Sequence, residues 1–159
     1  MRRLESKLFV KHRFACLWAL ALAGCSSELI PTNPPAGFPH AYAVADCAPW
    51  DGPAVTVYLT ARPADSTEFP WPQVRISIWR GAETLPGQSF AWPSDVQVGA
   101  ATRCTDPTAC ETASTARVSF TAATGDSTLS GYTQMTFPGG APLSGSFRAI
   151  WRATRAMCG

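Results

Sequence analysis

The six cysteines have the most definite chemistry in this sequence: Cys16, Cys25, Cys47, Cys104, Cys110 and Cys158. A thiol can be acylated, oxidised to a disulfide, bound to zinc or used as a nucleophile. Zinc is disfavoured, because only Cys104 and Cys110 are closely spaced and no histidine lies near them. The sequence therefore predicts no metal and no cofactor, and it assigns the cysteines to anchoring and cross-linking.

Cys25 ends a segment with the composition of a secretory signal. Five basic residues lie in the first thirteen positions, and an apolar run from Phe14 to Ala23 follows. That run is too short to span a bilayer, which takes about 20 residues. The Leu-Ala-Gly-Cys sequence at 22–25 resembles the lipobox of bacterial lipoproteins. The alternative is an ordinary signal peptide that happens to contain a cysteine.

The resemblance covers residues 1–27 only, and it implies where the chain is held. In that family the cysteine becomes the first residue of the mature chain and carries the lipid, with palmitate among its acyl groups. Ser26 stands where an Asp would retain such proteins in the inner membrane. The implied location is the cell envelope, lipid-anchored, on the periplasmic or the surface face of the outer membrane.

Four cysteines then remain for an oxidising compartment, which predicts two disulfides with three formal pairings. Cys104 and Cys110 enclose the short polar loop Thr-Asp-Pro-Thr-Ala, so we pair them with each other. The second predicted pair is Cys47 with Cys158, which would tie the beginning of the domain to the end of the chain.

The charge of the mature part argues against nucleic acid as a partner. The whole chain carries a formal charge of +2, but five of its thirteen basic residues lie in the signal. Residues 25–159 contain eight arginines, no lysine and ten acidic residues. A weakly acidic chain without a basic cluster is a poor nucleic-acid binder, and its membrane attachment is left to the lipid.

Three segments are expected along the chain: a signal peptide at 1–24, a lipidated, proline-rich tether at 25–40 and a single domain at 41–159. Pro31, Pro34, Pro35 and Pro39 make the tether semi-rigid. Apolar and polar residues alternate in seven short runs at 54–62, 73–80, 88–92, 96–103, 115–122, 128–137 and 143–152. The fold class is therefore all-β: an antiparallel β-sandwich of seven or eight short strands, with a small β-barrel as the alternative.

The last two of these runs form the clearest local unit. They flank a Pro-Gly-Gly-Ala-Pro turn, which predicts a hairpin. We expect Phe137 to lie opposite Leu143, with Trp151 on the apolar face.

The sequence predicts no catalytic residue. The mature part contains a single histidine, His40, at the end of the expected tether, so a Ser-His-Asp arrangement would require it to fold back. Two carboxylates could still serve a glycosidase. Eight acids are candidates, and most lie in expected loops, where Asp and Glu usually form turns: Asp46, Asp51, Asp65, Glu68, Asp95, Asp106, Glu111 and Asp126.

Aromatic residues are the positive indication of binding. Trp50, Trp71 and Trp92 adjoin prolines in expected loops, and Tyr58, Trp79 and Tyr132 lie on otherwise polar strand faces. Such residues can stack on sugar rings or anchor a protein. They can instead fold back and cover the ends of the sandwich, and this is the interpretation that we favour.

Three functions follow, in this order. The first is a non-catalytic envelope lipoprotein with a structural or protein-binding β-domain. The second is a carbohydrate-binding module, which predicts a coplanar row of Trp and Tyr. The third is a carboxylate-pair hydrolase, which predicts two acids about 5–10 Å apart in a cleft.

Overall fold

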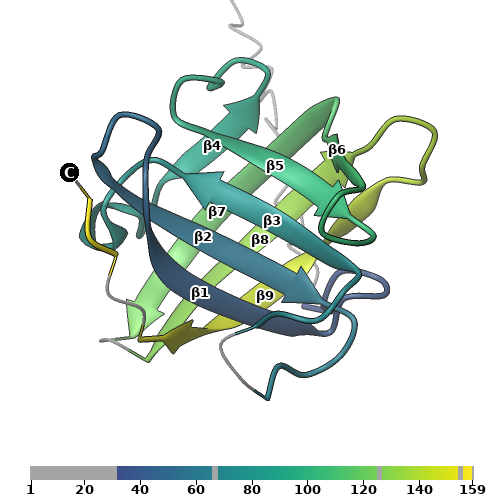
Figure 1. The fold of residues 1–159 in the computed structure, drawn as a ribbon, viewed down its shortest axis with the longest axis horizontal. Helices are drawn as coiled ribbons and strands as arrows, with labels where there is room; N and C mark the ends of the chain where they lie inside the picture. Colours follow the sequence, from purple (N-terminus) through teal and green to yellow (C-terminus); the bar gives the residue numbers. More distant parts are fainter. Residues whose placement is uncertain (1–31, 66–67, 125–126, 154–155, 159) are drawn as a thin grey trace, which may run out of the picture.

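The computed structural model describes residues 32–65, 68–124, 127–153 and 156–158, and within them the protein is all-β, as predicted (Figure 1). A single turn of 3-10 helix, η1 (Ala82–Thr84), accompanies the strands. The strands are β1 (His40–Cys47), β2 (Pro53–Thr60), β3 (Gln73–Ile78), β4 (Ser89–Trp92), β5 (Gly99–Cys104), β6 (Cys110–Thr112), β7 (Thr115–Thr124), β8 (Thr128–Thr136) and β9 (Leu143–Arg152). No helix in the described ranges is long and apolar enough to cross a membrane.

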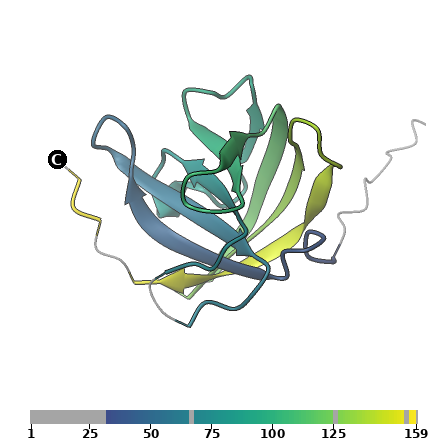
Figure 2. The same ribbon diagram turned by 45° about the vertical axis from the view of Figure 1, so that its right-hand side comes forward.

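All nine strands belong to one sheet, in the order β4-β7-β8-β9-β1-β2-β3-β5-β6. The sheet curls into a half-barrel, so that β1, β2, β3 and β5 cross in front of β7, β8 and β9 (Figures 1 and 2). The two layers of the expected sandwich are therefore continuous. They join where β1 pairs with β9 in parallel, whereas the other pairs are antiparallel.

The two ends of the curled sheet meet at the short junction between β6 and β7. The Ala113 N–H donates to the Ala101 carbonyl of β5 (2.9 Å), and the Ser114 N–H donates to the carbonyl of Thr136, the last residue of β8 (2.8 Å). Residues 113 and 114 thus donate hydrogen bonds to backbone carbonyls of both layers, and buried carbonyls require such partners. The Trp92 indole of β4 also donates to the Gly99 carbonyl of β5 (2.7 Å).

The inward faces of both layers form one apolar core. Alternation along the strands brings Val57, Ile76 and Val118 inside with no exposed surface. Phe120 makes edge-to-face contacts with Phe90 and Phe147, with ring centroids 6.1 and 6.0 Å apart. Burying an aromatic or aliphatic side chain of this size contributes roughly 1.5–3 kcal/mol, so the core supplies most of the stability.

A glycine makes room for this aromatic packing. A Cβ atom at Gly131 would lie 2.4 Å from the Ser119 carbonyl oxygen and 2.6 Å from the Phe147 ring. Both distances are shorter than van der Waals contact, so an alanine there would displace the ring or the strand.

The β8–β9 hairpin forms with a register two residues away from the one expected. Met135, not Phe137, lies opposite Leu143. Phe137 leaves the ladder and is buried beneath Arg103, whose guanidinium carbon is 4.7 Å from the ring centroid. Because the shift is even, the same side chains face the core as expected.

Residues 32–39, expected as part of a tether, lie against β9. The Ser146 N–H donates to the Asn33 carbonyl (2.9 Å), and Phe38 packs on the core. A Cβ atom at Gly145 would be 2.4 Å from the Pro35 nitrogen, so only glycine permits this close approach. The rest of the expected tether, 25–31, lies outside the described residues, as do the signal, Cys16 and Cys25.

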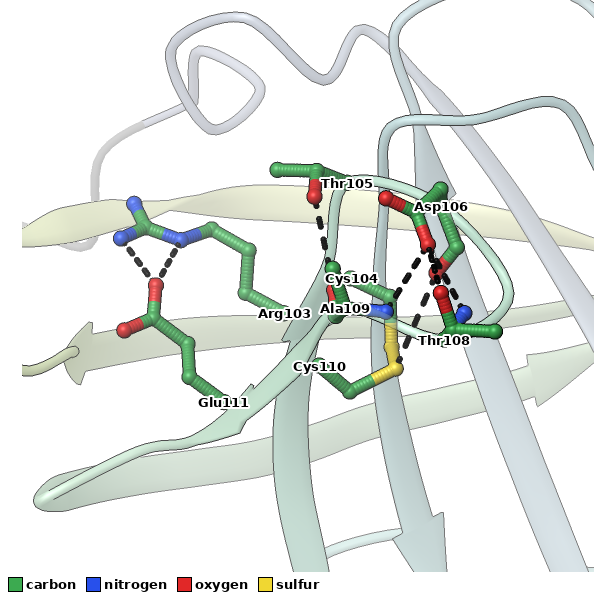
Figure 3. The surroundings of a disulfide bond; sticks show 8 residues. All are labelled: Arg103, Cys104, Thr105, Asp106, Thr108, Ala109, Cys110 and Glu111. Atoms are coloured by element: carbon green, nitrogen blue, oxygen red, sulfur yellow. Dashed lines mark hydrogen bonds and ion pairs between the residues drawn. A yellow bond between two sulfur atoms is a disulfide. The ribbon is translucent and has the colours of Figure 1, made fainter.

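Both predicted disulfides are present. Cys47 pairs with Cys158, 111 positions later, and ties the end of β1 to the end of the chain (Cα–Cα 5.5 Å). Cys104 pairs with Cys110 across the β5–β6 hairpin (Cα–Cα 4.0 Å). Figure 3 shows the second disulfide beneath the loop that it closes.

Candidate functional site

The outer face of β1–β3 carries a loop that folds across it. This loop, described at 61–65 and 68–72, connects β2 to β3. The Ala64 N–H donates to the Tyr42 hydroxyl (2.8 Å), and the Arg152 guanidinium donates to the Ala64 carbonyl (2.9 Å). Arg62 reaches back to the Trp71 carbonyl (3.2 Å). Side chains of β1 and β9 therefore hold the loop against the sheet.

The loop and the sheet together form a cluster of Tyr58, Phe69, Trp71 and Arg75, which we name the aromatic–arginine groove. Phe69 stacks on Tyr58, with centroids 4.1 Å apart and planes inclined by 20°. The Arg75 guanidinium carbon lies 5.6 Å from the Tyr58 centroid and 5.1 Å from that of Trp71. β2 and β3 pair Tyr58 directly with Arg75, which explains why the two side chains meet.

Two concave spaces lie on either side of the Phe69 and Trp71 side chains. One, of about 310 Å³, includes all four groove residues together with Glu68, Gln73 and Pro107. The other, of about 510 Å³, continues along the loop, and Arg62 and Asp65 line it. Glu68, Phe69 and Trp71 line both, so the surface is an elongated depression with aromatic walls.

Arg75 is the cation of this groove, and its geometry is largely fixed. When the Gln73 amide oxygen faces Arg75, it accepts from Nε (3.3 Å) and Nη2 (2.9 Å). No ion pair joins Arg75 to an acid within the described residues, whereas Arg103 is paired there with Glu111 (Figure 3). A guanidinium held between rings loses little freedom when a ligand binds, and it offers planar donors to a carboxylate.

Tyr58 remains a neutral hydroxyl in this setting. Burial raises the pKa of the Tyr58 phenol above its ordinary value; the Arg75 charge opposes this shift, and the Asp46 charge adds to it. The protonated phenol can therefore donate a hydrogen bond to a ligand throughout the neutral range.

The other predicted aromatic residues do not join this groove. Trp50, of which 58% is exposed, meets Trp79 edge to face with centroids 5.1 Å apart, beside the start of β2 and the end of β3. Trp92 belongs to the core, with 8% exposed. Tyr132 is half-buried on β8, between Ser119 and Ser146 on the neighbouring strands. The four candidate tryptophans therefore lie in three places and form no row. Trp151, expected on the apolar face, is partly buried against the core.

Most of the candidate acids have structural partners. Asp46 accepts hydrogen bonds from the Cys47 N–H and the Thr56 hydroxyl, both at 2.8 Å. Asp95 accepts from the Ala91 N–H (2.6 Å), which occupies a backbone donor of edge strand β4. Glu111 forms an ion pair with Arg103, and Asp65 and Glu68 line the depression beside the groove. Asp126 lies outside the described residues.

Asp106 and Asp51 form turns. The Asp106 carboxylate accepts from the Thr108 hydroxyl and the Thr108 and Ala109 N–H groups, and these bonds lower the pKa of Asp106. Asp51 adopts a positive φ of 62° in the β1–β2 turn, where Asp is better tolerated than most residues.

His40 begins β1 opposite Thr60. Within the described ranges, no group of three His, Cys, Asp or Glu side chains could hold a metal ion.

Sequence reasoning identified Tyr58 and Trp71 as candidates but missed Phe69 and Arg75. A signal was present for Arg75, because it alternates with apolar residues in a run beside that of Tyr58. Phe69 follows a loop of no regular period, so only the folded loop reveals its position.

Comparison with protein-family models, curated proteins and solved structures found no match to this chain. Its function therefore has to be argued from the groove and from the N-terminal motif.

Proposed function

We propose that this chain is a non-catalytic, lipid-anchored protein of the bacterial cell envelope whose β-domain binds a protein partner through the aromatic–arginine groove. The observation that carries the proposal is that Tyr58, Trp71 and Arg75 lie together on the outer face of the sheet. Tyr, Trp and Arg are enriched among the few residues that dominate the binding energy of protein interfaces. Here they are ordered before any partner arrives, which reduces the entropy lost on binding.

The anchor is the second part of the proposal. Cys25 carries the lipid, and residues 25–31 connect it to the segment docked on β9. Seven extended residues reach about 25 Å at most, so the domain stays close to the membrane surface. Ser26 directs the protein to the outer membrane. Two disulfides are usual for a domain exported to an oxidising compartment.

A carbohydrate-binding module is the second candidate, and one observation favours it. Glu68 and Trp71 line the same depression, and an acid together with an aromatic ring is a combination that can bind sugar hydroxyls and stack on a sugar ring. We rank it second because the tryptophans are dispersed and Phe69 covers one face of Tyr58.

Photo-cross-linking in intact cells tests the proposed function. Pro107 lines the groove without belonging to the aromatic–arginine cluster, so a photoreactive benzoylphenylalanine in its place leaves the cluster intact. The matched control places the same group at Arg117, which is exposed on β7 in the other layer.

The proposal predicts a discrete protein adduct from position 107, none from 117, and loss of the adduct when Arg75→Gln or Cys25→Ala is added. Equal adducts from both positions, or no adduct, would contradict it. An adduct that glycan-degrading enzymes remove would support the second candidate.

A further inference from the structure

We infer that the aromatic–arginine groove binds an extended peptide segment that places one carboxylate against Arg75 and an apolar or proline side chain against Trp71. This inference rests on the proposed function and names the chemistry of the partner. Three arginines of the described residues lie over aromatic rings: Arg75, Arg103 and Arg152. Arg152 lies over Tyr42 and donates to the Ala64 carbonyl, so it holds the loop in place. The inference is carried by the contrast between the other two.

Arg103 and Arg75 differ in their acidic partner. Arg103 lies over Phe137 and is neutralised by Glu111 on the neighbouring strand. Arg75 lies over Tyr58 and Trp71, but in the described part of the chain its only side-chain acceptor is the neutral amide of Gln73. A half-buried guanidinium without a counter-charge attracts a carboxylate, and a charged hydrogen bond in such a site is stronger than a neutral one.

The Tyr58 hydroxyl adds a second donor close to the same place. β2 and β3 pair Tyr58 with Arg75, so phenol and guanidinium project from directly opposite positions. The phenol is protonated at neutral pH, because the ordinary tyrosine pKa is about 10 and burial raises the pKa of Tyr58 further. The guanidinium and the phenol together favour a carboxylate over a monatomic anion, because each carboxylate oxygen can then accept a hydrogen bond.

The shape of the surface favours an extended chain over a single ring. The two depressions adjoin along the Phe69–Trp71 wall, and prolines line both: Pro63 and Pro70 in one, Pro107 in the other. Open, aromatic-lined grooves of this kind accept extended or polyproline segments, whose side chains enter successive pockets.

The acids at the rim limit the charge of the ligand. Glu68 lines the same space as Arg75 and also the adjoining space, where Asp65 and Arg62 lie, so the depression carries charges of both signs and disfavours a uniformly acidic segment. The preferred peptide therefore carries a single acidic residue, followed or preceded by proline or apolar residues and then by a neutral or basic one. This pattern distinguishes the groove from a general anion-binding patch.

Peptide titration tests the inference with the full acylated chain in detergent micelles. The probes are short fluorescent peptides built of proline and alanine in three matched forms: one Asp, the same position as Asn, and the same position as Lys. Glucuronic acid and muramic acid form a separate arm. Dissociation constants are measured by fluorescence polarisation for the wild type, Arg75→Gln, Trp71→Ala and the control Arg117→Gln.

We expect the Asp peptide to bind at least about tenfold more tightly than the Asn peptide, as loss of a charged hydrogen bond implies. That preference should disappear in Arg75→Gln, persist in Arg117→Gln and weaken as salt is raised. Trp71→Ala should weaken all peptides. Equal affinity for the Asp and Asn peptides, a preference that survives Arg75→Gln, or tight binding of the acidic sugars instead would overturn the inference.

The two experiments fail separately. A protein adduct from position 107 together with no preference for the Asp peptide would leave the proposed function standing and remove the inference. Selective binding of the Asp peptide without any adduct in cells would keep the ligand chemistry and remove the envelope partner.

Discussion

Loss of the long-range disulfide should destabilise the protein more than loss of the local one, because the two disulfides close loops of very different length. Cys47–Cys158 joins residues 111 positions apart, and Cys104–Cys110 joins residues 6 apart. The chain-entropy relation gives about 4.8 kcal/mol for the first and about 2.2 kcal/mol for the second at 25 °C. The matched variants are Cys47→Ala with Cys158→Ala, and Cys104→Ala with Cys110→Ala.

Burial adds to the smaller figure without reversing the order. Cys104 is 1% exposed, so its replacement by alanine also leaves a small gap that costs roughly 1 kcal/mol. The loss from the local pair should then total about 3 kcal/mol, still below that from the long-range pair. Domains of this size are stable by only about 5–15 kcal/mol, so the Cys47/Cys158 variant should lose about a third or more of its total stability.

Urea unfolding followed by tryptophan fluorescence measures both losses by linear extrapolation to water. A Cys47/Cys158 variant that is already unfolded without urea would agree with the prediction. The reasoning would be refuted if the Cys104/Cys110 variant lost as much stability as the other, or more. That result would mean that the end of the chain contributes little constraint, and that the β5–β6 hairpin depends on its cross-link.

Four further predictions concern the fold and the groove. Gly131→Ala should lower the free energy of unfolding by about 1–3 kcal/mol, because its methyl group would overlap the Phe147 ring and the β7 backbone; urea unfolding measures this, and an unchanged midpoint would contradict the packing. Gly145→Ala should release residues 32–39 from β9 and expose the Ser146 amide to hydrogen exchange, while Ser144→Ala, at the exposed neighbouring position of β9, should not. Glu111→Gln should cost less than about 1 kcal/mol, and the difference should shrink with added salt, since the Arg103–Glu111 pair is about a third exposed. The pKa of Tyr58 is raised in the folded protein, so its contribution to folding stability is complete below the unfolded tyrosine pKa of about 10 and is lost as the pH rises through the folded pKa. The urea midpoint should therefore fall less above that pH in Tyr58→Phe than in the wild type. Equal falls in both proteins would contradict the raised pKa of Tyr58.

Hydrophobic alternation was sufficient to predict the fold class and seven of the strands. Two strands were missed, for reasons of composition and length. β1 is rich in alanine, and Val44 is its only β-branched residue, so its pattern is weak. β6 has three residues, too few to show any period. Both are specified by their neighbours, β1 by β2 and β9 and β6 by the disulfide-linked β5.

The curl of the sheet could not be derived from alternation, because period two describes the faces of a strand and not the order of strands. The parallel β1–β9 pair joins residues about a hundred positions apart, and no local pattern specifies such a contact. The hairpin register failed for a related reason. Phe137 fits the alternation of β8 but lies outside the ladder, buried beneath Arg103, a residue of another strand.

The candidate site was half visible in the sequence. The sequence indicated the loop tryptophans and the face tyrosines as candidates, but their burial depends on how a loop returns to the sheet. Trp71 and Trp92 both precede a proline, yet one lines an open groove and the other bonds to Gly99 inside the core. The partner atoms that decide between these outcomes lie on other strands.

The proposed function requires an exported chain that is acylated at Cys25 and oxidised at the four remaining cysteines. Intact-mass spectrometry of the protein extracted from cell membranes measures both properties at once. We predict a chain of residues 25–159 that carries acyl groups on its first residue and lacks the four hydrogens removed by two disulfides. An unprocessed chain that begins at Met1, carries no lipid and has reduced thiols would contradict the account.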